Sequence, residues 1–335
     1  MKSTVKDIAK LANVSPATVS NVLNNRKGVS DEIKQNVLRA AKELGYSKDT
    51  ATDRNAIRFV IFKKHGNVVT DTPFFSSLIE GIEKECRYQG YELLISHLNI
   101  SDKDYTEAVN NICGDFTAGL ILLATEMLLE DIRLFENCLF PVIIIDSCFR
   151  EGIFDSVLIN NEDAAYKATK YLIENGHTRI GYLSSSAYIN NFYYRKQGYL
   201  EAMKDGNLVS SEAFHVKLAP TMEEAYLDML KYLNNNTELP TAFFADNDTI
   251  AFGAMKALME KGYKIPEDIS IIGFDDMPFC EMTSPRLTTI KVFKQEMGSL
   301  AVKRLIRRIE SNDIIIQKTQ IYTELVVRDS VKNIG

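Results

Sequence analysis

From Ile57 onward, the chain alternates short apolar runs with amphipathic stretches of helical period. The apolar runs are IRFVIF, YELLIS, GLILLA, PVIIID, RIGYLSS, TAFFA and ISIIGFDD. Three of them follow a helical stretch that ends in glycine, at YQGYELLI, ENGHTRIGYL and EKGYKIPEDISIIGF, and glycine readily closes a helix. Strands that alternate with helices form a parallel sheet covered on both faces. Because this pattern exceeds the size of one ordinary core, it predicts two doubly wound α/β lobes.

Polar or aromatic side chains come directly after several of these runs. Asp146 follows PVIII, Asn247 follows TAFFAD, Asp275 follows ISIIGF, and the loop SSSAYINNFYYR follows RIGYL. The carboxyl ends of parallel strands meet at one edge of a sheet, where α/β proteins bind ligands. The sequence therefore predicts a ligand crevice lined by these residues.

The first 46 residues read as three short helices. Thr4 and Asp7 form a candidate capping box before the first helix. Ser15 is the N-cap of the second helix, with Pro16 in the first helical position, and Ser30 caps the third before Gly45 closes it. The residues expected to form the core are Ile8, Leu11, Val19, Val22, Leu23, Ile33, Val37, Leu38, Ala41 and Leu44. The short NVS connection between the first two helices is typical of a helix-turn-helix.

The charge of the chain is divided unevenly. Residues 1–58 carry eleven Lys/Arg and six Asp/Glu, a net charge of +5, whereas the remainder carries 28 basic and 39 acidic residues, or −11. Small residues early in the second helix allow close approach to base edges, and nearby hydroxyls and amides can hold phosphates. A three-helix unit that merely packs on the body is the alternative. The basic excess favours double-stranded DNA as the partner.

Other function classes lack their sequence signals. The five cysteines form no Cys-x-x-Cys pair, so we expect reduced, buried thiols at Cys86, Cys113, Cys138, Cys148 and Cys280. The four histidines have no zinc-ligand spacing. Neither G-x-G-x-x-G nor G-x-x-x-x-G-K-S/T occurs. With no apolar run of about 18 residues and no export signal, we expect a cytoplasmic protein without cofactor, metal or membrane partner.

The head segments TVKDIAKLANVSPATVSNVLNN and VSDEIKQNVLRAAKELGY resemble the DNA-binding head of the LacI/GalR family of bacterial regulators. The resemblance implies that Pro16, Ala17 and Asn21 read bases, and that phosphate contacts come from Thr4, Ser15, Thr18 and Asn24. The family often has arginine at the position of Asn21. Asparagine favours adenine and arginine favours guanine, so this departure predicts a changed base preference.

The connection from head to body, GYSKDTATDRNAIRFVIF, departs further from the family. It reaches the first strand about half a dozen residues sooner, and it lacks the leucine that in the family wedges into the minor groove at the operator centre. The sequence leaves open whether residues 50–55 form a short hinge helix. The sequence predicts a shortened hinge, and it predicts that this protein bends its operator less than relatives with the hinge leucine do.

The body resembles the periplasmic-binding-protein-like core of the same family through DTPFFSSLIEGIE, NNEDAAYKATKYLIENGHTRIGYL, ADNDTIAFGAMKALMEKGYKIPEDISIIGFDD and SPRLTTI. The implied fold class is a small all-α helix-turn-helix head followed by a core of two doubly wound parallel-sheet lobes. The resemblance places the chain crossings near Asn160, Ile290 and Tyr322. It thus implies a head at 1–47, a hinge at 48–56, an N-terminal lobe at 57–160 plus 291–321, and a C-terminal lobe at 161–290 plus 322–335.

By the same resemblance, the effector-binding residues are Phe74, Phe75, Asp146, Asn191, Arg195, Asn247 and Asp275. Carboxylates, amides and an arginine beside aromatic rings suit a polyhydroxylated ligand, so we expect a sugar or sugar derivative. The aromatic residues Tyr188, Phe192, Tyr193 and Tyr194 keep an aryl glycoside or a nucleoside open. Each site residue also has a plainer interpretation: the phenylalanines as core, Asn247 and Asp275 as helix caps, and Arg195 as a surface residue.

The function favoured by these observations is that of a homodimeric transcriptional regulator, a repressor rather than an enzyme, whose operator binding responds to a small molecule. A sugar-processing enzyme is one alternative, since paired carboxylates also serve glycosidases. An exported sugar-binding protein is the other, and the head and the missing export signal oppose it. The sequence leaves open whether a phosphocarrier protein is a partner and whether the protein is a dimer or a tetramer. It also leaves open whether the effector is an inducer or a corepressor.

Overall fold

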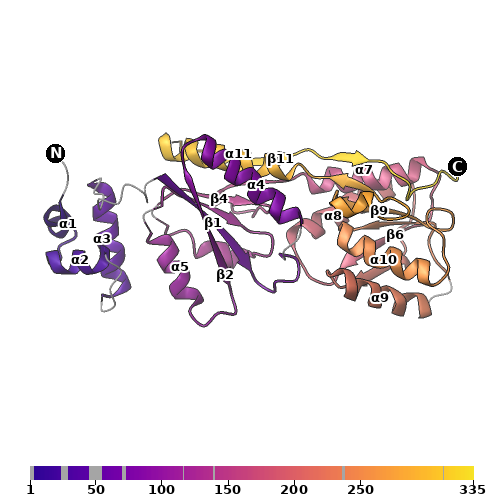
Figure 1. Ribbon diagram of the computed structural model, residues 1–335, viewed down its shortest axis with the longest axis horizontal. Coiled ribbons are helices and arrows are strands. Elements are labelled where there is room, and N and C mark those ends of the chain that lie inside the picture. The colour runs from indigo at the N-terminus through magenta and orange to yellow at the C-terminus, as the bar shows by residue number, and fades with distance from the viewer. Residues whose placement is uncertain are drawn as a thin grey trace.

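The computed structural model describes residues 4–23, 29–44, 55–69, 73–115, 117–138, 140–235, 238–311 and 313–335. A three-helix head lies at one end of an elongated molecule, followed by two α/β lobes in line with it (Figure 1). Asn24 and residues 48–54 of the predicted hinge at 48–56 lie outside the described residues. The helices of the head are α1 (Val5–Leu11), α2 (Pro16–Leu23) and α3 (Asp31–Glu43).

Local side-chain bonds fix where the head helices begin. The Thr4 backbone N–H donates to the Asp7 carboxylate at 2.8 Å, and the Ser15 hydroxyl accepts the Thr18 N–H at 3.0 Å, as the capping signals predicted. The prediction that Leu11 and Ile33 are core residues is wrong, because they are 49% and 37% exposed. Alanines that were not predicted as core lie in this small apolar cluster instead: Ala9, Ala12 and Ala40.

Lobe A is built on a parallel sheet of order β11-β5-β4-β3-β1-β2. Its strands are β1 (Ala56–Lys63), β2 (Glu92–Asn99), β3 (Gly119–Leu123), β4 (Val142–Ile145), β5 (Asp155–Ile159) and β11 (Lys318–Ile321). Its helices are α4 (Pro73–Tyr88), α5 (Tyr105–Cys113), α6 (Leu129–Arg133) and α11 (Lys294–Glu310). Strand β3 is buried along its whole length, as expected of a central strand that is covered on both faces.

Lobe B has the order β12-β10-β9-β8-β6-β7, and only β12 runs antiparallel to its neighbour. Its strands are β6 (Ile180–Ser185), β7 (His215–Leu218), β8 (Ala242–Ala245), β9 (Ser270–Asp275), β10 (Thr288–Lys291) and β12 (Glu324–Val326). Its helices are α7 (Asn161–Glu174), α8 (Asn190–Asp205), α9 (Met222–Asn235) and α10 (Asp248–Glu260), with 3₁₀ turns at Glu212–Phe214 and Pro278–Glu281. The described strands therefore divide between the sheets of two doubly wound lobes.

The chain passes between the lobes at three places: from β5 to α7, from β10 to α11, and from β11 to β12. Helices α7 and α8 pack closely, because Gly198 has no Cβ to meet the backbone of Glu162. This close approach sets the position of α8, which carries Asn191 and Arg195 at the junction of the lobes.

One cysteine expectation is wrong. Cys113 and Cys138 form a disulfide across 25 residues, whereas Cys86, Cys148 and Cys280 are free and buried. Cys113 ends α5, and Cys138 follows the turn after α6, so both lie in the apolar cluster on one face of the lobe A sheet. The two thiols are 25 residues apart in the sequence, and spacing alone could not show that the folded chain brings them together.

No helix among the described residues is long and apolar enough to span a membrane.

Candidate functional site

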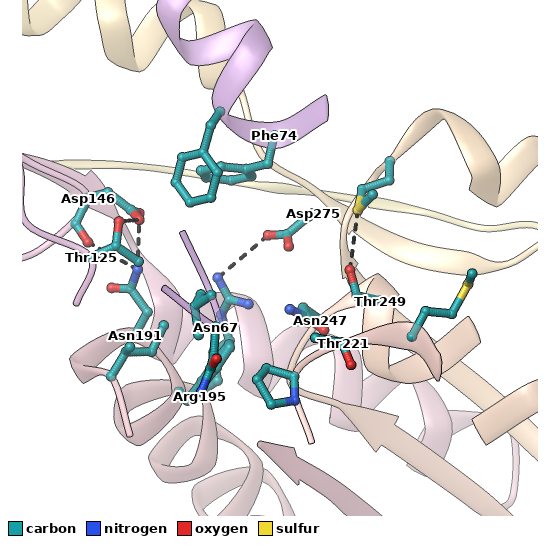
Figure 2. Close-up of a pocket in the computed structure, with 17 residues that line it drawn as sticks. Asn67, Phe74, Thr125, Asp146, Asn191, Arg195, Thr221, Asn247, Thr249 and Asp275 are labelled. Atoms are coloured by element: carbon teal, nitrogen blue, oxygen red, sulfur yellow. Dashed lines mark hydrogen bonds and ion pairs between the residues drawn. The ribbon is translucent and has the colours of Figure 1, made fainter. Parts of the chain in front are cut away.

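A cavity of about 200 Å³ lies between the lobes. All seven residues predicted to bind an effector line it: Phe74, Phe75 and Asp146 from lobe A, and Asn191, Arg195, Asn247 and Asp275 from lobe B. Figure 2 shows the polar ends of five of them, Asp146, Asn191, Arg195, Asn247 and Asp275, around a common space below the ring of Phe74. The structure thus brings the predicted set together, and their role toward a ligand remains a prediction.

Arg195 is the central cation of the cavity. It is only 3% exposed, so the interpretation as a surface residue is wrong. Its Nε donates to the Asn161 Oδ1 at 2.8 Å, and its Nη1 donates to the backbone oxygen of Asp246. Its guanidinium carbon lies 3.5 Å from the centroid of the Phe274 ring. A guanidinium fixed on three sides presents its remaining donors in one direction.

That direction leads to Asp275, at the end of β9. Arg195 Nη2 lies 3.6 Å from Asp275 Oδ1, beyond hydrogen-bond distance, and this buried oxygen has no hydrogen-bond partner. Burial raises the pKa of the Asp275 carboxyl, although Arg195 and Lys294 oppose the shift. An acceptor that is buried without a partner is a candidate ligand contact.

Asp146 occupies the matching strand end in lobe A. Its Oδ2 accepts the Thr125 hydroxyl at 2.6 Å, and its Oδ1 accepts the Asn191 amide at 3.0 Å, a bond that joins the two lobes (Figure 2). Burial raises the pKa of Asp146 to about 6, against the lowering effect of the Thr125 hydrogen bond. Asp146 and Asp275 have φ values of 65° and 114°. Such left-handed backbone is uncommon for residues other than glycine and is concentrated at functional sites.

Asn247 serves the fold as well as the cavity. Its Oδ1 accepts the Ile250 N–H at 2.9 Å and caps α10, which confirms the interpretation as a helix cap. The amide NH₂ remains for a ligand. The neighbouring carboxylate, Asp248, points into the lobe instead, where it accepts the Thr289 hydroxyl at 2.6 Å, and burial raises its pKa to about 7.

Three aromatic side chains form part of the apolar wall. The rings of Phe74 and Phe75 lie edge to face, 5.1 Å apart, and Phe192 joins them from α8. In contrast, Tyr188 and Tyr193 are 61% and 45% exposed and do not line the cavity. The aromatic loop therefore contributes only one ring to this wall.

Sequence reasoning missed Glu126, which shapes the cavity indirectly. Glu126 is 3% exposed. Its carboxylate accepts five backbone N–H groups, at distances of 2.9–3.0 Å, from Lys64, His65, Gly66, Val68 and Val69. Burial disfavours its charge, but these N–H groups more than offset that effect and lower its pKa. Asn67 and Val68, on the loop so held, line the cavity. The available signal was its place just after the apolar run GLILLA.

Further lining residues escaped the sequence analysis: Thr125, Ile189, Pro220, Thr221, Met222, Thr249 and Met277. Thr125 follows an apolar strand, as Asp146 does, so the same rule could have found it. Within the described residues, no group of three or more His, Cys, Asp or Glu side chains could hold a metal ion.

In the head, the N-terminal end of α2 is open to solvent. Ser15, Pro16 and Ala17 are exposed, and Thr18 and Asn21 are half-buried. The Thr4 hydroxyl lies 2.7 Å from the Asp7 carboxylate, so a phosphate would have to compete with Asp7 for it. Exposed small side chains at the start of a second helix fit entry into a major groove, and the individual DNA contacts remain predictions.

A helix-turn-helix head joined to two lobes that enclose a polar cavity defines a class of protein: regulators that combine DNA binding and ligand binding in one chain. Residues 4–49 match the model for bacterial regulatory proteins of the lacI family, and residues 169–331 match the periplasmic binding protein-like domain. The HTH-type transcriptional repressors PurR of Mannheimia succiniciproducens and Histophilus somni are 33% and 35% identical over 99% of this chain and all of their own length.

Solved structures agree in fold. The regulator CelR in complex with cellobiose has a TM-score of 0.75 at 24% identity, covering 98% of this chain and 100% of its own. The lac repressor dimer bound to operator and an anti-inducer has a TM-score of 0.73 at 23% identity, covering 99% and 100%. A family regulator from Enterococcus faecium with bound ribose has a TM-score of 0.71 at 25% identity, covering 84% and 100%. The chain belongs to the lacI family and is a DNA-binding transcriptional repressor.

Proposed function

We propose that a small polyhydroxylated molecule, a sugar or sugar derivative, binds in the cavity between the lobes and controls the operator affinity of a homodimer. The observation that carries this proposal is the set of polar groups supplied by both lobes around one cavity, including Asp275 Oδ1, which is buried without a hydrogen-bond partner. A ligand held by both lobes has different affinities for their open and closed arrangements, which is the requirement for control.

The chemistry of the wall favours a sugar. Asp275 Oδ1 can accept a hydrogen bond from a sugar hydroxyl. Arg195 and the Asn247 amide can donate hydrogen bonds to ring or hydroxyl oxygens. The face of Phe74 suits the apolar C–H side of a pyranose or furanose. A volume of about 200 Å³ lies below the usual range for drug-sized ligands, so a monosaccharide fits better than a longer sugar. The complexes of CelR with the disaccharide cellobiose and of the E. faecium regulator with the monosaccharide ribose support a sugar as the ligand class.

A nucleoside is the second candidate, because Phe74, Phe75 and Phe192 could also enclose a flat base. Catalysis is the weaker alternative. Asp146 accepts bonds from Thr125 and Asn191, so both of its oxygens are engaged, whereas a glycosidase needs two carboxylates directed at one glycosidic bond. We therefore propose that the protein is not an enzyme, and the absence of product after prolonged incubation with the binding sugar tests this point.

The deciding experiment is a thermal-shift screen of the full-length protein against monosaccharides, sugar phosphates and nucleosides. A ligand that binds only the folded protein raises the melting temperature as its concentration rises above Kd. The proposal expects a saturable rise with at least one monosaccharide or its phosphate. A rise with nucleosides alone, or with none of the three classes at millimolar concentration, would overturn it.

We also propose that the protein acts as a homodimer in the cytoplasm, where two heads meet the two half-sites of an operator. Sedimentation equilibrium tests the dimer, and a monomer at micromolar concentration with normal operator binding would contradict it.

A further inference from the structure

The disulfide between Cys113 and Cys138 lies beside the surface on which the DNA-binding head rests. Cys113 is the last residue of α5, and the residues around it contact α3 of the head. Lys34 Nζ donates to the Asn111 Oδ1 at 3.2 Å, and a Cβ at Gly114 would lie 3.2 Å from the Leu38 side chain. The end of α5 is therefore part of the head's docking surface.

A second observation marks the same place as a junction. A cavity of about 270 Å³ lies between the head and lobe A. Leu23 and Lys34 line it on the head side, and Arg58, Asn111 and Asp115 line it on the side of lobe A. Asp115 forms an ion pair with Arg58 of β1. The segment of residues 111–115 thus carries contacts to the head on one side and to the sheet on the other. A small shift of this segment changes how the head is seated.

The bridge restricts that segment. It ties Cys113 to the residue that follows the α6 turn, where the Cys138 N–H donates to the Phe135 oxygen at 3.1 Å and the Phe135 side chain is fully buried. Without the bridge, the last turn of α5 is held by its own helical bonds and by apolar packing. With it, the turn is anchored to a fixed point of lobe A.

We propose that Cys113 and Cys138 are a reversible redox pair whose closed form seats the head on lobe A and strengthens operator binding, and whose reduced form releases the head. Disulfides are rare in reducing compartments, and those that form there are usually transient or sensing. The closed form leaves the exposed start of α2 free, so it presents the head to DNA with less conformational freedom to lose.

The chemistry is a two-electron thiol–disulfide exchange with a low-molecular-weight disulfide. Cys138 is half-buried whereas Cys113 is 2% exposed, so Cys138 reacts first. Its thiolate attacks one sulfur of the small disulfide and expels a small thiolate. The Cys113 thiolate then attacks the Cys138 sulfur of the mixed disulfide, closing the bridge and expelling the second. The two protons of the protein thiols pass to the two small thiols.

The test equilibrates full-length protein in buffers of reduced and oxidised glutathione, alkylates the free thiols, and counts them by mass. In parallel, amide hydrogen exchange is measured in α3 and α5. Binding is measured to a DNA duplex that the wild-type protein has selected from a randomised library. We expect loss of two thiols on oxidation, exchange in both helices slowed at least threefold, and duplex affinity raised at least threefold.

Matched variants assign the response. Cys138→Ser and Cys113→Ser should abolish all three changes, and Cys138→Ser is the safer variant because Cys138 is half-buried whereas Cys113 is fully buried. Cys86→Ala is the control and should keep them, because burial raises the pKa of that thiol to about 12. Thiols that stay reduced in every glutathione mixture would overturn the proposal, as would equal exchange and affinity in both redox states or a full response in Cys138→Ser.

Discussion

Replacement of Glu126 by glutamine tests how the cavity wall is held. Five backbone N–H groups of residues 64–69 share the two oxygens of this buried carboxylate, three on Oε2 and two on Oε1. Glutamine keeps the shape but replaces one oxygen with an NH₂ donor. At least two N–H groups then face a donor, and each unpaired buried N–H costs about 1–3 kcal/mol. Because the loop is partly exposed and can recover water, we expect Glu126→Gln to lower the free energy of unfolding by about 3 kcal/mol.

The assay is urea unfolding at pH 7, followed by ligand titration. Because Asn67 and Val68 line the cavity, ligand affinity should fall together with stability. The pKa of Glu126 is lowered, so its contribution is fully present above the ordinary glutamate value of 4.5 and is lost as the pH falls through the folded-state pKa. The difference from wild type should therefore be constant from pH 6 to 8.

Glu130→Gln is the matched control, because Glu130 is a nearby glutamate whose side chain is 69% exposed and lies 3.4 Å from Lys64. It should leave the urea midpoint unchanged. A Glu126→Gln protein with the wild-type midpoint and ligand affinity would refute the view that this carboxylate holds the loop.

Three further predictions concern the cavity, the head and a buried acid. Arg195→Ala and Asp275→Ala should each weaken ligand binding by about 2–4 kcal/mol, since each leaves polar partners unpaired; unchanged calorimetric titrations would place the ligand elsewhere. Asn21→Arg should move base preference from adenine toward guanine by about 1–3 kcal/mol, and a randomised-operator selection that yields the wild-type site would contradict base reading by Asn21. Burial raises the pKa of Asp248 from the ordinary 3.8 to about 7, so the free energy of unfolding should fall as the pH rises from about 4 to about 7 and then level off. Between pH 5 and pH 8, the free energy of unfolding in urea should therefore fall by about 2 kcal/mol more in wild type than in Asp248→Asn. Equal pH dependence in the two proteins would argue against the raised pKa.

Local signals were enough to predict most elements. Every apolar run singled out in the sequence is a strand, namely β1, β2, β3, β4, β6, β8 or β9. These runs are too short for a typical helix and are rich in β-branched and aromatic residues, which favours strands. The head helices begin at their predicted caps. Strands β5, β7, β10, β11 and β12 were not singled out, since they have three to five residues and mixed polarity, and tertiary pairing decides them.

The cavity was predictable to the extent that it follows the topology. Asp146, Asn247 and Asp275 each come after an apolar strand, and parallel strands bring such positions together. Glu126 obeys the same rule, but its function depends on the folded path of residues 64–69, which nothing in its neighbours reveals. The Cys113–Cys138 bridge was missed for a similar reason, because it joins two segments with no shared motif.

Asn191 links the lobes through bonds that a ligand would have to keep or replace. Its amide donates to the backbone oxygen and the carboxylate of Asp146, at 3.1 and 3.0 Å, and its own oxygen accepts the Asn161 amide at 3.1 Å. Asn191→Ala should cost about 1–3 kcal/mol of stability, because buried polar groups on both lobes lose partners.

The same change should loosen the lobes in the ligand-free protein. Small-angle scattering should then show a larger radius of gyration than wild type, and a saturating ligand that closes the lobes should restore the wild-type value. Asn190→Ala is the control, since its side chain makes only long bonds of 3.3 and 3.5 Å to the opposite lobe and should change scattering little. If Asn191→Ala scatters and melts like wild type, the Asp146–Asn191 bonds do not hold the lobes, and ligand control must act through the other contacts and the chain crossings between them.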